Sequence, residues 1–353
     1  MSVSEFYIAC RNGDLAAVQR LLPSLTVFDI NRMEPNESTA LHAASYYGHH
    51  EIVQLLLEAG AIRSTLNMYK MTPADEAATP EIKKLFNRRS AEAQGRYTAT
   101  AHNSDWAKMA IGRSLKSAAH RLANTTGFGN MNTARERIIK AVELRDAQGM
   151  DEINYFLSKG CDTNDTSCLL RAYTAETDFY RRLNIRSAQL NSQGGHPSRD
   201  IYVHEWSLAF AAQLSKDPTF EKFYWTGTTY RGMKMTEYDL SLYKNKHVKR
   251  IVLNSFLSTS KNREVALAFA ASPLPDQFSV LCKYVINQPW SALDLKTVSE
   301  YPEEEEVLVV PNMCYNITDL KEGNLIEIEL VQGDMTSIMS GFVDKTFTTD
   351  LDG

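Results

Sequence analysis

The chain has 353 residues, of which 43% are hydrophobic and 23% charged, and its formal net charge is −5. This is the composition of an ordinary globular protein that is long enough for two domains, each with its own core. A mildly acidic chain without a long basic cluster argues against nucleic acid as the main partner. No apolar run approaches the roughly 18–20 residues needed to cross a bilayer, so we expect no membrane-spanning segment.

The cysteines and the N-terminus both favour the cytoplasm. The first six residues lack the basic and hydrophobic regions of a signal peptide. The number of cysteines is odd and no CxxC pair is present, so we expect neither a disulfide scaffold nor a zinc site. These cysteines are Cys10, Cys161, Cys168, Cys282 and Cys314. We therefore expect a cytoplasmic protein that binds no metal.

Residues 1–90 contain an internal repeat. The clearest unit, residues 38–61, opens with Thr-Ala-Leu-His-Ala-Ala, turns at Gly48 and continues into a second apolar helix. An upstream unit places Gly13 at the equivalent turn, and residues 71–77 restart the pattern downstream. The pattern resembles the ankyrin repeat, in about two and a half copies.

The resemblance implies structural roles for two polar residues in the clearest unit. Thr39 can cap the first helix, and His42 can join neighbouring turns by hydrogen bonds, so we interpret His42 as structural. Two and a half repeats are fewer than a freestanding solenoid usually needs. We therefore expect the block to lean on the rest of the protein, or its third unit to serve as a cap. The resemblance to ankyrin repeats also implies that this block binds a protein partner.

The next stretches are predicted to be a linker, a helical segment and a strand-rich segment. Residues 91–131 are mostly polar and carry helical spacing over 106–122, which predicts a linker with one amphipathic helix. Helical patterns follow at 134–144, 150–157, 169–184 and 201–214. Strand patterns then occupy 226–232, 248–258, 278–286, 306–310 and 325–331, with a helix at 263–271. Helices first and strands afterwards indicate an α+β domain over 132–335, followed by a polar tail over 336–353.

Three short stretches among the predicted strands contain candidate functional residues. Arg231 lies at a strand end, Ser258-Thr259-Ser260 closes an apolar strand, and an acidic run precedes Val307. Each has a structural reading, since Ser-Thr-Ser can cap a helix and an acidic run can be a solvated loop. If the last strand begins within the run, Glu304 and Glu306 share one face at a separation of roughly 6–7 Å.

Their order and spacing together carry a more specific signal. The matching stretches are Tyr230-Arg231-Gly232, residues 256–260 and residues 304–308, with Tyr173 in a helical lead-in. They resemble the arginine–serine–glutamate class of mono-ADP-ribosyltransferases over roughly residues 132–332. The resemblance implies an ADP-ribosyltransferase domain with a helical lead-in and a split, mostly antiparallel β-core. It also implies NAD, bound as a substrate without a Rossmann unit.

The resemblance also implies roles for the site residues. Glu306 stabilises the oxocarbenium-like transition state at the ribose, and Arg231 binds the phosphates or their ribose. Ser258 positions Glu306 and the nicotinamide ribose. The remaining expected contacts to NAD come from Tyr173, Tyr230, Gly232, Thr259 and Phe269. For Tyr173 and Phe269, simple core packing remains an alternative.

Glu304 matches the Glu-x-Glu pattern that this class uses for arginine acceptors. A carboxylate there can hold a guanidinium and accept its proton. We therefore expect an arginine mono-ADP-ribosyltransferase that acts on a protein with an exposed arginine. An NAD glycohydrolase, which does not need Glu304, is an alternative within the same chemistry. A non-catalytic ankyrin binding protein is the alternative of another class.

Overall fold

The structure is a computed structural model that describes residues 3–88, 106–108, 130–192, 205–245, 249–271 and 273–333. The chain forms two compact units. The ankyrin unit comprises Met1–Glu92, Val142–Tyr180 and Lys296–Glu303, and the sheet unit comprises Ala93–Ala141, Arg181–Leu295 and Glu304–Gly353. None of the helices within the described ranges is long and apolar enough to cross a membrane.

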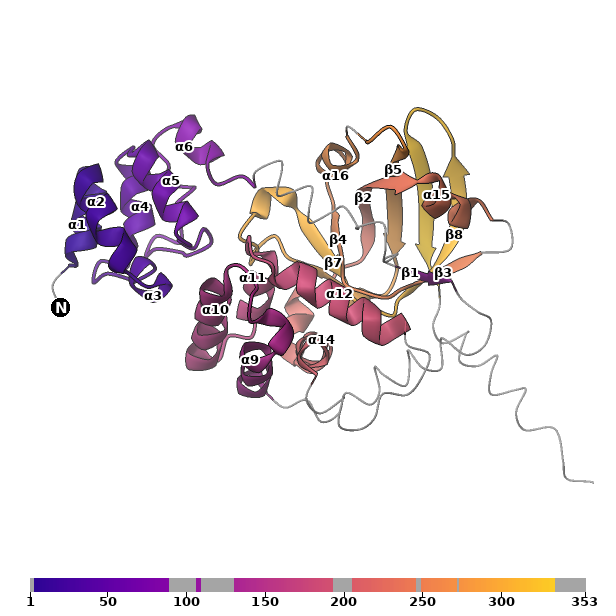
Figure 1. The fold of residues 1–353 in the computed structure, drawn as a ribbon, viewed down its shortest axis with the longest axis horizontal. Helices are drawn as coiled ribbons and strands as arrows, with labels where there is room; N and C mark the ends of the chain where they lie inside the picture. Colours follow the sequence, from indigo (N-terminus) through magenta and orange to yellow (C-terminus); the bar gives the residue numbers. More distant parts are fainter. Residues whose placement is uncertain are drawn as a thin grey trace, which may run out of the picture. The chain divides into compact units, whose positions relative to one another are not determined.

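The N-terminal part of the ankyrin unit consists of short helices, drawn in indigo and violet in Figure 1. They are α1 (Glu5–Asn12), α2 (Leu15–Leu21), η1 (Leu22–Ser24), α3 (Val27–Ile30), α4 (Ala40–Tyr46), α5 (His50–Glu58) and α6 (Pro80–Lys84). Leu41, Ile52, Val53 and Leu56 are at most 2% exposed and form one core with residues of the neighbouring helices. The predicted helical ankyrin block is thus confirmed.

The predicted structural role of His42 is also confirmed. Thr39 and His42 form a reciprocal cap at the start of α4, in which the Thr39 hydroxyl lies 2.8 Å from Nδ1 of His42. The other ring nitrogen, Nε2, lies 3.2 Å from the carbonyl oxygen of Met71 in the next repeat. Burial lowers the pKa of His42, so a neutral ring serves as a link between repeats.

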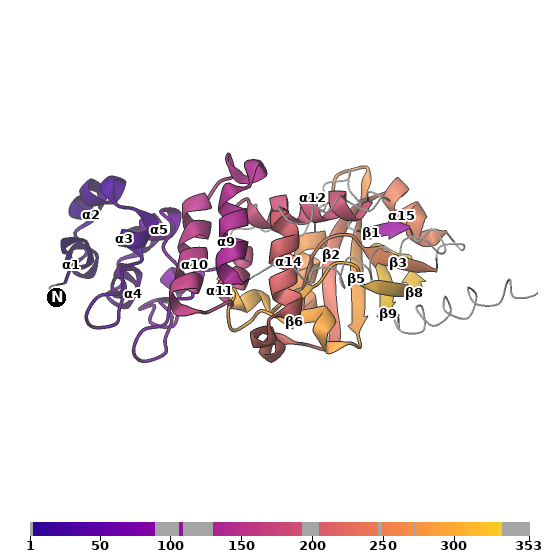
Figure 2. The ribbon, with the colours of Figure 1, turned by 90° about the horizontal axis from the view of Figure 1, so that it is seen from below.

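Two further helices complete the ankyrin unit. They are α10 (Met150–Thr163) and α11 (Cys168–Thr174), with the short turn η3 (Val142–Leu144) before them. Figure 2 shows α10 and α11 next to the ankyrin helices. Phe28 of α3 meets Tyr155 of α10 edge to face, with ring centroids 5.2 Å apart. The helices that open the predicted transferase domain therefore cover one side of the ankyrin block.

The sheet unit contains nine described strands in one sheet, in the order β1-β3-β8-β9-β5-β2-β4-β7-β6. All neighbours are antiparallel except β5 and β9. The strands are β1 (Trp106–Lys108), β2 (Gly227–Thr236), β3 (Arg250–Leu253), β4 (Leu257–Ser260), β5 (Gln277–Ile286), β6 (Ala292–Asp294), β7 (Glu306–Val309), β8 (Cys314–Lys321) and β9 (Ile326–Gln332). An α+β domain with a mixed, mostly antiparallel sheet is confirmed.

Helices accompany this sheet. They are α9 (Met131–Lys140), α12 (Phe179–Ser192), α14 (Trp206–Lys216), α15 (Glu237–Lys244) and α16 (Arg263–Ala270), with 3₁₀ turns η4 (Pro218–Phe223), η5 (Pro289–Ser291) and η6 (Pro302–Glu304). α14 packs on α9 through Ala134, Ala209 and Ala212. Phe210 of α14 also meets Phe256, just before β4, with ring centroids 5.4 Å apart. In Figure 1, α16 lies beside β2, and the two elements are in contact.

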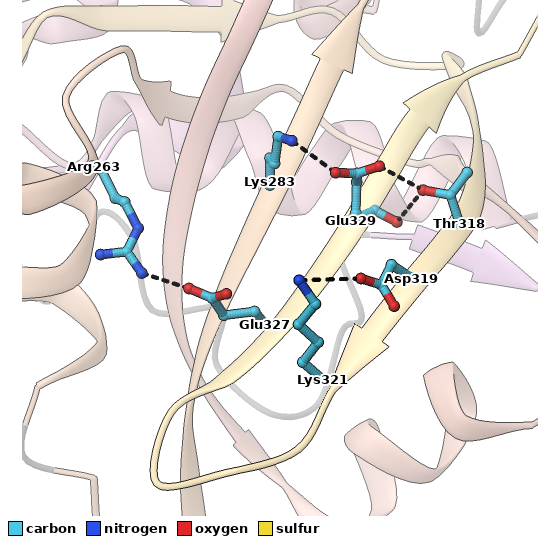
Figure 3. A network of polar contacts seen from close by, with 7 residues as sticks. All are labelled: Arg263, Lys283, Thr318, Asp319, Lys321, Glu327 and Glu329. Carbon is cyan, nitrogen blue, oxygen red and sulfur yellow. Dashed lines mark hydrogen bonds and ion pairs between the residues drawn. The ribbon is translucent and has the colours of Figure 1, made fainter.

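One face of β5, β9 and β8 is polar. Burial alternates along β9, as the sequence Ile-Glu-Ile-Glu-Leu-Val-Gln predicts for a strand with one buried face. Lys283 and Glu329 are directly opposite each other in the register of β5 and β9, and their charged groups lie 2.7 Å apart (Figure 3). The ion pair and a hydrogen bond from Thr318 lower the pKa of Glu329. This face therefore meets solvent, and the opposite face holds the core.

Several sequence predictions of elements were wrong. Trp106–Lys108, predicted as the start of a helix, is the edge strand β1 paired with β3; the rest of that predicted helix and the tail lie outside the described residues. The stretch 248–258 is two strands, β3 and β4, because Asn254 and Ser255 interrupt it. The elements α15, β6 and β8 were missed. β8 was missed because polar and apolar residues do not alternate regularly along it, and its burial does not alternate either.

Candidate active site

The site is built where the sheet divides between β2 and β4. β2 pairs with β5 from Gly227 to Thr236, but it pairs with β4 only at Tyr230 and Ser260. Beyond that pair the backbone ladder stops. There the side chain of Arg231 links the two strands: its Nη1 donates a 2.8 Å hydrogen bond to the carbonyl oxygen of Ser258 on β4. Arg231 is 4% exposed, so a permanently charged side chain is fixed at the point where the strands part.

Hydroxyl groups of β4 hold the three neighbouring strands together. The Thr259 hydroxyl lies 2.8 Å from the Thr229 hydroxyl on β2 and donates to the carbonyl oxygen of Val307 on β7, at 2.7 Å. Ser260 donates from its hydroxyl to the carbonyl oxygen of Glu304 at 2.7 Å. Ser258 is 2% exposed. The predicted serine stretch is therefore a strand, and no part of it caps a helix.

The two predicted glutamates lie next to this strand but are held differently. β7 begins at Glu306, which pairs with Ser260, and Glu304 is the last residue of the turn η6. Between them Glu305 has a left-handed backbone with φ +46°. The strand begins at the last residue of the acidic run, in agreement with the strand predicted over 306–310. Glu304 precedes it, so Glu304 and Glu306 are not alternate residues of one strand and do not share a strand face in the way that an earlier start would give.

The backbone of this acidic turn is fully tied to its neighbours. Lys261 donates its N–H to the carbonyl oxygen of Glu305 at 3.1 Å, and Leu295 donates to Glu306 at 2.9 Å. With the bond from Ser260, each of the three carbonyl groups is fixed. The side chains of Glu304 and Glu306 are 6% and 0% exposed. A non-glycine residue in the left-handed region costs energy and persists where its surroundings hold it.

The sheet register brings Ser258 and Glu306 close together. Ser260 pairs with Glu306 and Ser258 pairs with Leu308. Paired residues share a face, and so do residues two apart on one strand. Ser258 and Glu306 are therefore diagonal neighbours on one face. Tyr230 shares the face of its partner Ser260 through the pair that joins β2 to β4.

Gly232 and Phe269 belong to the contact between β2 and α16. A Cβ atom on Gly232 would lie 1.8 Å from the carbonyl oxygen of Ala266, so only glycine permits this approach. Phe269 is 6% exposed and packs with Val265 of the same helix. Tyr173 lies in the ankyrin unit, where it is fully buried and its ring centroid is 6.5 Å from that of Tyr180. Contact of these three residues with NAD stays a prediction.

Sequence reasoning missed Thr229 and the anchoring role of Ser260. The third residue of Ser-Thr-Ser was visible, but its bond to Glu304 depends on the pairing of β4 with β7. A cavity of about 680 Å³ lies elsewhere, between the ankyrin helices and α10, and is lined by Gly60, Arg63, Glu152 and Glu176 among others. None of the predicted site residues lines it. Across the described ranges, no group of three His, Cys, Asp or Glu side chains is placed to hold a metal ion.

Comparisons with known proteins cover both parts of the chain. Residues 6–86 match the ankyrin repeat family in three copies, half a copy more than predicted from the sequence. The human NAD-capped RNA hydrolase NUDT12 is 38% identical over 88 residues, which are 24% of this chain and 18% of that protein. The chain thus spans less than a fifth of the length of this hydrolase, and the same holds for the hydrolase of Macaca fascicularis and of Pongo abelii.

Solved structures of ADP-ribosyltransferases are also similar, at low identity. The Vis toxin of Vibrio splendidus is 20% identical with a TM-score of 0.36, covering 54% of this chain and 86% of that one. HopU1 of Pseudomonas syringae is 16% identical with a TM-score of 0.37, covering 69% and 96%. Exoenzyme S of Pseudomonas aeruginosa is 16% identical with a TM-score of 0.38, covering 63% and 100%.

The family described as NAD:arginine ADP-ribosyltransferase matches residues 157–337, just over half of the chain. This range includes β2, β4 and β7, which carry the arginine, serine and glutamate residues described above. The protein therefore belongs to the NAD:arginine ADP-ribosyltransferase family, with ankyrin repeats in front of its transferase domain.

Proposed function

We propose that the protein transfers ADP-ribose from NAD to arginine side chains of a protein target and releases nicotinamide. NAD-dependent ADP-ribosyl transfer is the activity of the family that the chain matches. The proposal adds to this activity that the acceptor is an arginine side chain. The observation that carries it is the pair of buried carboxylates, Glu304 and Glu306, on a tightly anchored turn beside Ser258 and Arg231.

The chemistry assigns a different task to each carboxylate. The glycosidic bond between the ribose and nicotinamide breaks, and its electron pair leaves with the nicotinamide. Glu306 stabilises the positive charge that develops on the ribose. A guanidinium nitrogen of the acceptor then forms the new bond to the same carbon, and Glu304 accepts the proton that this nitrogen loses.

Arg231 and Ser258 prepare the site for the substrate. The Nη1 of Arg231 already bonds the backbone of β4, so the guanidinium plane is fixed before NAD binds. A fixed guanidinium suits bidentate binding of phosphate oxygens. Ser258, a diagonal neighbour of Glu306, is placed to orient that carboxylate and the nicotinamide ribose.

The test uses the purified chain with labelled NAD and agmatine, a free guanidine acceptor. Wild type is expected to form ADP-ribosyl-agmatine. Glu304→Gln is expected to retain only hydrolysis of NAD, and Glu306→Gln to lose both reactions by about 10²–10³-fold, the size of a lost electrostatic stabiliser. Glu303→Gln, an exposed neighbour in the same turn, is the matched control and should behave as wild type.

Two other outcomes would each replace the proposal. Cleavage of NAD without any transfer to agmatine or to protein arginine would make the chain an NAD glycohydrolase. If NAD neither binds nor turns over, the ankyrin block becomes the functional part, and the chain is a binding protein.

We also propose that the ankyrin block recruits a protein partner in the cytoplasm. Tyr46, Tyr47 and Tyr69 are 61%, 48% and 70% exposed on this block, and exposed aromatic residues are enriched in protein interfaces. No disulfide joins any of the five cysteines, all of which lie in the described residues, and this fits a reducing compartment. Replacing these tyrosines with serine should weaken transfer to the protein target in cell extract and leave transfer to agmatine unchanged.

A further inference from the structure

The segment directly before the two glutamates belongs to the ankyrin unit. Residues Lys296–Glu303 cluster with the ankyrin block and with α10 and α11. Within this segment Glu300 is 1% exposed and Tyr301 is fully buried. A buried carboxylate and a buried phenol require polar partners, and here the partners come largely from the ankyrin block.

The carboxylate of Glu300 is held by two consecutive ankyrin residues. The backbone N–H of Arg63 donates to it at 2.7 Å, and the Ser64 hydroxyl donates to its other oxygen. Arg171 of α11 donates in turn to the Ser64 hydroxyl. The backbone N–H of Glu300 donates to the Thr174 hydroxyl at 3.1 Å. Both the side chain and the backbone of Glu300 are thereby fixed.

The ring of Tyr301 is held by two arginines of the N-terminal block. The guanidinium carbon of Arg88 lies 3.7 Å from the ring centroid, and that of Arg63 lies 4.9 Å from it. Arg88 also donates to the carbonyl oxygen of Thr174 at 3.1 Å. The Tyr301 hydroxyl donates to Glu176, whose carboxylate lies 3.6 Å from the guanidinium of Arg63. Arg63, Ser64 and Arg88 form what we call the ankyrin clamp.

Along the chain, the segment that the clamp holds lies closer to Glu304 than to Glu306. Tyr301 is followed at once by the turn η6, Pro302–Glu304, so the clamp fixes the start of the turn that ends in Glu304. Glu306 instead lies within a strand that pairs with β4 and β6. Glu306 itself pairs with Ser260 of β4, and its carbonyl oxygen accepts a hydrogen bond from the N–H of Leu295, so its own strand contacts fix it.

We propose that the ankyrin block is a positioning element of the transferase, in which the ankyrin clamp holds Glu300 and Tyr301 and so places Glu304 for the acceptor arginine. This inference rests on the proposed function of Glu304 and Glu306. It makes Glu300 a positioning residue. Loss of the clamp lowers the transfer of ADP-ribose to a guanidine acceptor and leaves hydrolysis of NAD in place.

The test compares transfer and hydrolysis in the full-length protein. Ser64→Ala removes one hydrogen bond to the Glu300 carboxylate, and Arg88→Ala removes the nearer cation from the Tyr301 ring. With labelled NAD and agmatine, each variant is expected to lower the ratio of transfer to hydrolysis by about tenfold, the scale of one lost hydrogen bond to a charged group. The KM for NAD should stay at the wild-type value.

Two matched controls separate positioning from general stability. Ser64→Thr keeps the hydroxyl and should restore the wild-type ratio. Ser24→Ala removes an exposed hydroxyl of the same block that bonds the Leu21 carbonyl, and it should leave the ratio unchanged. Thermal unfolding of each variant establishes that it is folded at the assay temperature.

The outcomes are distinguishable. A wild-type ratio in both folded clamp variants would overturn the inference and leave the proposed function standing. An equal loss of transfer and hydrolysis would also overturn it, because the clamp would then support the fold alone. A wild-type protein that transfers nothing to arginine or agmatine would overturn the proposed function and this inference with it.

Discussion

The carboxyl group of Glu152, on α10, is surrounded mainly by charge of its own sign. Burial is the first cause that raises its pKa, to about 7, and the neighbouring charge of Glu300 is the second; Arg63 opposes the shift and Glu176 adds to it. The folded protein therefore binds this proton more tightly than the unfolded chain does, in which the pKa stays near 4.5. Its contribution to stability is present at low pH and is lost as pH rises through this window.

We predict that Glu152→Gln removes this pH dependence. The variant should gain stability over wild type at pH 8, on the order of 2 kcal/mol, less than the full pKa shift implies because the side chain remains partly accessible. Below pH 4 the two proteins should be equally stable. Urea unfolding between pH 4 and pH 8 measures this difference. Parallel pH profiles for the two proteins would show that Glu152 titrates normally.

At the scale of elements, the contact of α16 with β2 decides the shape of the site. The helix crosses the strand next to Arg231, and Gly232 is where the two backbones meet. The sequence motif Tyr-Arg-Gly was visible, but the reason for its glycine was not. Only the packed helix shows that the position must be empty, because the carbonyl of Ala266 occupies the space of a Cβ atom.

Gly232→Ala should therefore destabilise the sheet unit by about 3 kcal/mol, the upper range for overpacking against a backbone atom. It should also lower activity, because β2 carries Arg231. Gly323→Ala is the control, since a Cβ there would lie 3.5 Å from the Leu325 carbonyl oxygen, an ordinary contact. Thermal unfolding and the agmatine assay measure both effects. A Gly232→Ala protein as stable as the Gly323→Ala control would contradict this account.

The backbone of the acidic turn, Glu304 to Glu306, also could not be predicted from the local sequence. Period-two reasoning placed Glu304 and Glu306 on one strand face, whereas β7 begins only at Glu306. The left-handed Glu305 between them is held by the N–H of Lys261, more than 40 residues earlier in the chain. A local pattern cannot reveal a backbone conformation that a distant hydrogen bond stabilises.

At the scale of the whole molecule, the ankyrin block contacts other segments of its unit, which agrees with the expectation that so few repeats lean on the rest of the protein. Within the ankyrin unit it contacts α10 through Phe28 and Tyr155, and residues Lys296–Glu303 through Glu300 and Tyr301. The family match counts three repeats, about the number needed for stability, but the third is abbreviated to α6.

We predict that residues 1–90 expressed alone are less stable than the same block in the full chain. The fragment exposes the surfaces of Phe28, Arg63 and Ser64 that other segments cover, and it loses their contacts. Hydrogen exchange of α4 and α5 in the fragment and in the full chain measures the difference. Equal protection, with a cooperative thermal transition of the fragment, would establish that the block folds independently.

The sequence by itself indicated the family, which the comparison with family models confirmed, and it supplied the site residues that we propose. The ankyrin pattern, Tyr230-Arg231-Gly232, Ser258 to Ser260 and the Glu-x-Glu run are short and contiguous, so their chemistry is readable without a fold. Tertiary structure alone decided how these stretches are held: the sheet that parts at Tyr230 and Ser260, and the clamp that joins Arg63 and Glu300, 237 residues apart. Contacts between distant segments leave no periodic signal in the chain, because they depend on the packing of whole elements.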